Sequence, residues 1–148
     1  MLMPYNTVQY IKKEDVYSFV CKQRIATAMI FFSMAIVVTL MWVYVYPQML
    51  NVYNTFDTPL PTTIEKAPYI FAIIAAIHTG IGIYFLVNKP NEQSVLQKIS
   101  GYKEGEMIHI KNFAENKIQA VALLLMGITV GLIIIILVKP IYNLTNNL

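Results

Sequence analysis

Three long apolar runs interrupt an otherwise mixed sequence. They cover residues 25–46, 68–88 and 118–138, and none of them contains Asp, Glu, Lys or Arg. Each run reaches the roughly 20 residues that a helix needs to cross a hydrocarbon core about 30 Å thick. Uninterrupted apolar runs favour helices in lipid, because a helix satisfies its own backbone hydrogen bonds. The pattern predicts an all-α integral membrane protein with three transmembrane helices.

Prolines stand near the ends of these runs. Pro47 follows the first, Pro68 opens the second, and Pro140 follows the third. Because proline removes a hydrogen bond from a helix interior, we expect the first helix to end at Pro47 and the third at Pro140. The predicted segments are an N-terminal segment 1–24, helix 25–46, loop 47–67, helix 68–88, loop 89–117, helix 118–138 and tail 139–148.

The connecting segments carry weaker signals. The first loop holds several prolines, so we expect turns and short helices there and no sheet. Residues 94–100 resemble a short helix ended by Gly101. From about Glu106 onward, Ile110, Phe113 and Ile118 recur at helical spacing. This spacing predicts that the third helix begins in the second loop and enters the bilayer without a break.

Composition and charge support the membrane class and indicate an orientation. Hydrophobic residues make up 57% and charged residues 13%, whereas soluble domains carry about 25% charged residues. Nine of the 11 Lys and Arg residues fall in segments 1–24 and 89–117, and only Lys66 and Lys139 lie elsewhere. The positive-inside rule then predicts a cytoplasmic N-terminus and an outside C-terminus. We expect a multi-pass protein of the bacterial inner (cytoplasmic) membrane.

His78 is the most conspicuous polar residue inside a predicted span. Ionisable groups within a membrane often mark function, so His78 is the candidate cofactor-binding residue, as a haem ligand or a proton relay. None of the three runs contains a second ionisable partner, and the other histidine, His109, lies in a loop. The alternative is a neutral imidazole hydrogen-bonded to Thr79, to another helix or to a neighbouring subunit. We expect bound lipid rather than haem.

Small residues recur at every fourth position on two of the predicted spans. Such spacing lets helix backbones approach closely in lipid. We therefore expect helix packing at these positions, either within the chain or against another protein. The residues are Ala72, Ala76 and Gly80 on the second span and Gly127 and Gly131 on the third.

Catalytic and metal-binding motifs are not evident in the sequence. There is no glycine-rich phosphate loop, no nucleophile elbow and no paired-cysteine motif. The single cysteine, Cys21, rules out an internal disulfide. We expect a protein that is not an enzyme, with no catalytic residue, no metal site, no small-molecule substrate and no nucleic-acid partner.

The segment after the first run resembles a known family. Residues 46–64 contain Pro47, Tyr53 and Phe56, followed by Pro59, Leu60, Pro61 and Thr62. This pattern is similar to the inner-membrane platform proteins of type II secretion and type IV pilus systems, in which a proline-rich turn joins two membrane helices. The chain differs at Thr58, where the family has leucine, and its second loop is too short for the family's large cytoplasmic domain. The resemblance implies a cytoplasmic motor and a pilin-like helix as partners.

Three functions are consistent with these features. The first is an accessory or structural subunit that assembles with other integral membrane subunits and with membrane lipids. The second is a component of a secretion or pilus platform, suggested by residues 46–64. The third is a redox or transport subunit that uses His78. The short soluble segments and the small-residue positions favour the first.

Overall fold

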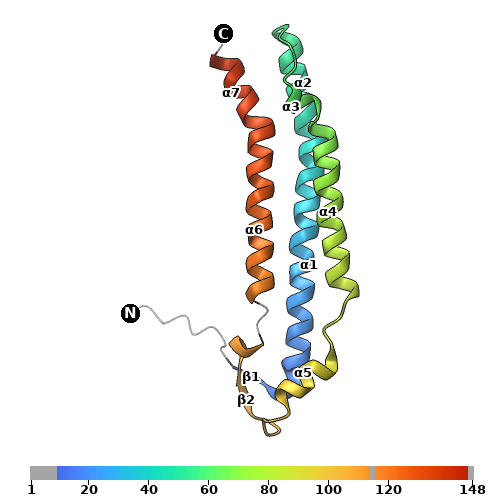
Figure 1. The fold of residues 1–148 in the computed structure, drawn as a ribbon, viewed down its shortest axis with the longest axis vertical. Coiled ribbons are helices and arrows are strands. Elements are labelled where there is room, and N and C mark those ends of the chain that lie inside the picture. The colour runs from blue at the N-terminus through green and yellow to red at the C-terminus, as the bar shows by residue number, and fades with distance from the viewer. Residues whose placement is uncertain (1–9, 114–115, 147–148) are drawn as a thin grey trace, which may run out of the picture.

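Three long helices give the molecule its shape. The computed structural model describes residues 10–113 and 116–146, and it is mostly helical (81%). Figure 1 shows the three long helices running side by side along the longest axis. In chain order their parts are α1 (Val16–Leu40), the π-helical segment η2 (Met41–Val45) and α2 (Tyr46–Thr55), then α4 (Ala67–Val87), then α6 (Asn116–Ile133), the π-helical segment η4 (Ile134–Val138) and α7 (Lys139–Asn146).

The described part of the chain has three helices that are long and apolar enough to span a membrane. They cover Lys13–Thr55, Ala67–Val87 and Ile118–Tyr142. The prediction of three apolar helices is confirmed. At 1.5 Å per residue the 43-residue first helix is roughly 65 Å long, about twice the thickness of a hydrocarbon core. The first helix is therefore long enough to extend beyond a bilayer core.

The expectation that Pro47 and Pro140 end their helices is wrong. Both prolines lie inside continuous helices, and a π-helical segment ends two residues before each of them. In these turns the backbone N–H of Tyr46 donates to Met41 and that of Lys139 donates to Ile134, five residues back. A proline ring clashes with the carbonyl four residues earlier in a regular α-helix. The extra residue in the turn changes this register.

The first long helix ends at Thr55, nine residues later than expected, and a left-handed residue follows it. Asp57 has a φ of 49°. Its N–H donates to the Asn54 carbonyl at 3.3 Å, and the Thr58 N–H donates to the Tyr53 carbonyl at 3.3 Å. This pair of bonds is a Schellman motif, which usually has glycine at the left-handed position. The chain then turns into the short helix α3 (Thr62–Glu65).

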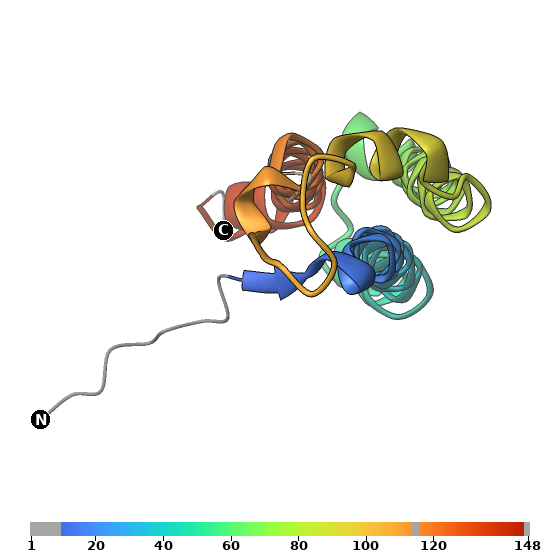
Figure 2. The same ribbon diagram turned by 90° about the horizontal axis from the view of Figure 1, so that it is seen from below.

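The other end of the bundle carries a small sheet, which was not expected. Strands β1 (Tyr10–Lys12) and β2 (Met107–His109) pair antiparallel, with Ile11 opposite Ile108. The 3-10 segments η1 (Lys13–Asp15) and η3 (Ile110–Asn112) and the helix α5 (Glu92–Ile99) complete this end. Figure 2 views the bundle from this side. We call it the sheet end, and the end with α2, α3 and α7 the proline end.

The sheet corrects the prediction for the start of the third helix. Residues from Glu106 onward do not form one continuous helix, because β2 and η3 precede α6. Gly105 has a φ of 75° and turns the chain just before β2. Ile108 is buried in a small core with Val16, Val20 and Ile99. Burial of this central strand residue favours pairing with β1 over helix formation.

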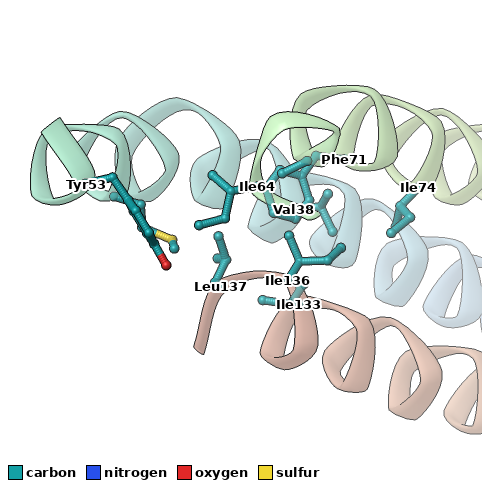
Figure 3. Packing of buried hydrophobic residues seen from close by; sticks show 10 residues of the cluster. Val38, Tyr53, Ile64, Phe71, Ile74, Ile133, Ile136 and Leu137 are labelled. Atoms are coloured by element: carbon teal, nitrogen blue, oxygen red, sulfur yellow. The ribbon is translucent and has the colours of Figure 1, made fainter. Parts of the chain in front are cut away.

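The long helices pack unequally. Figures 1 and 2 show α4 against α1 and α6 standing apart from both at the sheet end. At the proline end, residues from all three long helices form one hydrophobic core (Figure 3). This core contains Val38, Met49, Tyr53, Ile64, Ala67, Phe71, Ile74, Ile133, Ile136 and Leu137.

Candidate functional site

His78 lies on the inner face of α4, where it is 4% exposed. Its Nδ1 is 2.8 Å from the carbonyl oxygen of Ile74, and its Nε2 is 3.3 Å from the hydroxyl oxygen of Thr129 on α6. A carbonyl can only accept, so Nδ1 carries the proton in this arrangement. In a neutral ring Nε2 then accepts from the Thr129 hydroxyl. Both ring nitrogens of His78 are therefore hydrogen-bonded.

This hydrogen bond connects α4 to α6. The Phe31 ring of α1 also contacts the imidazole, with centroids 5.8 Å apart, so three helices meet at His78. The partner is Thr129 and not the neighbouring Thr79. A ligand role for Nε2 would require the Thr129 hydroxyl to turn away. Among the residues that the structure describes, no three His, Cys, Asp or Glu side chains group as metal ligands.

The close approach of α1 and α4 depends on Gly82. Gly82 is buried, and a Cβ atom built on it would lie 3.0 Å from the Phe32 ring of α1. A larger side chain at position 82 would clash with the Phe32 ring. Gly82 therefore provides a small-residue contact within the chain, and the four-residue spacing had not identified it.

The small residues named from the sequence lie elsewhere. Ala76, Gly80 and Gly127 are exposed, while Ala72 and Gly131 are partly buried. A Cβ atom built on any of the three glycines would have no other heavy atom within 4 Å. The structure thus gives these glycines no helix contact within the described chain. Packing against another protein stays a prediction.

The His78–Thr129 bond shows which way these residues point. Ala76 and Gly80 each lie two positions from His78, and Gly127 and Gly131 each lie two positions from Thr129. Two positions correspond to a rotation of roughly 160° about the helix axis. The two sets therefore point away from the interior of the bundle, one set from α4 and the other from α6. We call them the α4 stripe (Ala72, Ala76, Gly80) and the α6 stripe (Gly127, Gly131).

At the proline end, Tyr53 joins α2 to α7. Its ring is 3% exposed, and its hydroxyl donates to the carbonyl of Pro140 at 2.9 Å. The resemblance residues around it lie in different settings. Tyr53 is buried and Pro61 is partly buried, whereas the others are exposed: Pro47, Phe56, Pro59, Leu60 and Thr62. The turn from Pro59 to Thr62 leads from the end of α2 into α3.

Sequence reasoning missed two contacts between distant residues and the packing role of Gly82. Thr129 lies 51 positions from His78, and no local pattern pairs them. Tyr53 and Pro140 are 87 positions apart. Gly82 was visible as a glycine two residues after Gly80. His78 lies four residues earlier on the same face of the helix. Only this relation could have indicated that Gly82 packs inside the bundle.

Comparison of the chain with protein-family models, with curated proteins and with solved structures found no match. The resemblance to platform proteins therefore rests on residues 46–64 and on the order of the helices. The structure shows a mostly helical chain with three helices long and apolar enough to span a membrane.

Proposed function

We propose that the chain is a non-catalytic accessory or structural subunit of a larger membrane complex, and that it assembles through its transmembrane helices. The observation that supports this most is the outward direction of the α4 and α6 stripes. Their glycines have open space beside them, while the chain's own close contact uses Gly82. Small residues that face outward allow a second helix to approach closely in lipid.

The two stripes lie on two different helices and point away from the same interior bond. A partner on the α4 stripe and a partner on the α6 stripe would therefore contact separate faces. Two such faces suit a subunit that sits between neighbours. In lipid, this association gains van der Waals contact and interhelical hydrogen bonds and not hydrophobic burial. Small residues therefore favour helix association more than large side chains do, because they let the backbones approach closely.

We also propose the orientation and the location. Nine of the 11 Lys and Arg residues fall in segments 1–24 and 89–117, and the described parts of these segments lie at or near the sheet end. The positive-inside rule places this end in the cytoplasm and the proline end outside. This orientation holds for the bacterial inner membrane, which we propose as the location. Reporter fusions after residue 57 and after residue 105 test the orientation, because only the first should report an outside location.

The direct test of the subunit proposal is extraction of the native membrane in a mild detergent with the chain tagged. We expect a fixed set of other integral membrane proteins to co-purify in stoichiometric amounts. The visible absorption spectrum of the same sample is recorded, and a Soret band would favour the redox alternative through His78. A chain that elutes alone, or only with copies of itself, would contradict the proposal.

The platform alternative makes a narrower prediction in the same experiment. It requires a cytoplasmic motor protein and a pilin-like protein among the co-purified partners. A complex without either would leave the general subunit proposal intact and would remove this version of it.

A further inference from the structure

A groove opens between α6 and the α1–α4 pair in the half of the bundle near the sheet end. Its volume is about 390 Å³, within the range of about 300–1,000 Å³ that small-molecule sites occupy. Val121 and Tyr84 on its walls are 56% and 58% exposed, so the groove is open to its surroundings. Its lining is apolar or aromatic and includes Phe31, Tyr84, Phe85, Ile118, Val121 and Leu125.

A second cavity of about 300 Å³ lies beyond the groove towards the sheet end, and its lining is partly apolar, with Val20, Pro90, Val95 and Phe113. We call it the polar cavity because its other lining side chains are charged or polar. Arg24 and Lys98 line it, together with the polar side chains of Asn91, Ser94 and Asn112. The Arg24 guanidinium is held in place by a 2.7 Å hydrogen bond from Nη1 to the Asn88 carbonyl at the end of α4. This bond caps a helix C-terminus and fixes where the positive charge lies.

The groove and the polar cavity share one face of α1. Phe31 lines the groove and Arg24 lines the cavity. Residues seven apart differ by only about 20° around a helix and by about 10 Å along it. An apolar slot thus leads to a cationic, polar cavity at the membrane boundary.

We propose that these two cavities bind one anionic phospholipid from the leaflet at the sheet end, with an acyl chain in the groove and its phosphate beside Arg24 and Lys98. Apolar walls match the acyl chain, and two cationic side chains match the phosphate. Basic pockets between transmembrane helices are a known way of binding anionic headgroups. The inference requires membrane insertion, but it does not depend on the partner subunits of the proposed function.

The groove is too small to hold a whole helix, whereas a hydrocarbon chain fits inside it. A helix with side chains is about 10 Å across, so a single turn fills on the order of 400 Å³. The groove extends along α6 from Ile118 to Leu125, which is about two turns. Its 390 Å³ is therefore about half of what a helix would need over that length. A narrower hydrocarbon chain fits.

Native mass spectrometry of the full chain in detergent tests the headgroup assignment. Delipidated protein is titrated with phosphatidylglycerol and with phosphatidylcholine that carry the same acyl chains. We expect one phosphatidylglycerol per chain, bound in preference to phosphatidylcholine. Lys98→Gln should lower this preference about fivefold, the effect expected for one cation near anionic lipid. Lys103→Gln, on the same end but outside the cavity, should leave the preference unchanged.

A second pair of variants tests the groove. Val121→Trp fills the groove from an exposed position and should reduce retention of both lipids, whereas Val130→Trp, exposed elsewhere on α6, should not. Equal binding of the two lipids, or full retention by Val121→Trp, would overturn the proposal. So would inorganic phosphate that binds as tightly as the lipid, because the acyl chain would then contribute nothing.

Discussion

At the scale of single residues, His78 shows how a polar group is accommodated inside a helix bundle. An imidazole within membrane-spanning helices is costly unless its hydrogen bonds are made. Ile74 and Thr129 supply both bonds, one within α4 and one across to α6. The sequence allowed a neutral, hydrogen-bonded His78, but it could not name Thr129. The pairing of His78 with Thr129 depends on how α6 packs against α4, and no local sequence pattern predicts that packing.

A double-mutant cycle tests the role of this bond. His78→Phe and Thr129→Val should each destabilise the bundle by about 1 kcal/mol, the scale of an interhelical hydrogen bond in lipid. The double variant should lose less than the sum, since both changes remove the same bond. Unfolding by a denaturing detergent measures the free energies. Additive losses would show that the 3.3 Å contact contributes no coupling.

Two glycines on α4 offer a matched comparison of inner and outer faces. Gly82→Leu should force α1 and α4 apart, because the new side chain occupies the space of the Phe32 ring, at a cost of about 1–3 kcal/mol. Gly80→Leu should fold normally, since nothing lies within 4 Å of its Cβ position. Circular dichroism during thermal unfolding distinguishes them. Equal losses would contradict the assigned faces.

At the scale of elements, the apolar runs located the three long helices but misplaced several of their ends. A proline following an apolar run usually marks a helix end, and the sequence does not show that a π-helical turn precedes it. Strand β2 was missed for a different reason. Its partner β1 is distant in sequence, because Ile108 pairs with Ile11, 97 positions earlier. The contacts that decide such elements are distant in sequence.

The continuity of the first long helix past Pro47 can be measured. Spin labels at Leu40 and Thr55, in a Cys21→Ser background, should lie roughly 22 Å apart along a continuous helix of 1.5 Å rise per residue. Pulsed electron resonance should give one narrow distance distribution. A broad distribution, or a mean far below this value, would show that the helix breaks at Pro47.

The contact between α2 and α7 makes a separate prediction. Tyr53→Phe removes the hydroxyl that donates to the Pro140 carbonyl and should lower the free energy of unfolding by about 1 kcal/mol. Tyr69→Phe is the matched control, because Tyr69 is 73% exposed and should change little. An equal effect of both substitutions would argue against an anchoring role for Tyr53.

At the scale of the whole molecule, the sequence predicted the class of architecture but not the arrangement of its parts. Charge-free apolar runs are enough to identify three membrane-length helices. They do not show that α4 packs on α1, that α6 stands apart at the sheet end, or which faces stay uncovered. Those features depend on Gly82, on the His78–Thr129 bond and on the shared core at the proline end. The four-residue spacing identified the stripes but not the side of the bundle on which they lie.

The central claim is that the outward stripes hold partner subunits. Its most direct test is the size of the native complex on a blue-native gel, with Gly80→Leu and Gly127→Leu compared with wild type. Ile83→Leu serves as the control, because this position is also exposed on α4. We predict a smaller complex for either glycine variant, with unchanged helicity of the purified chain and no effect in the control. A full-sized complex in both glycine variants would contradict the account.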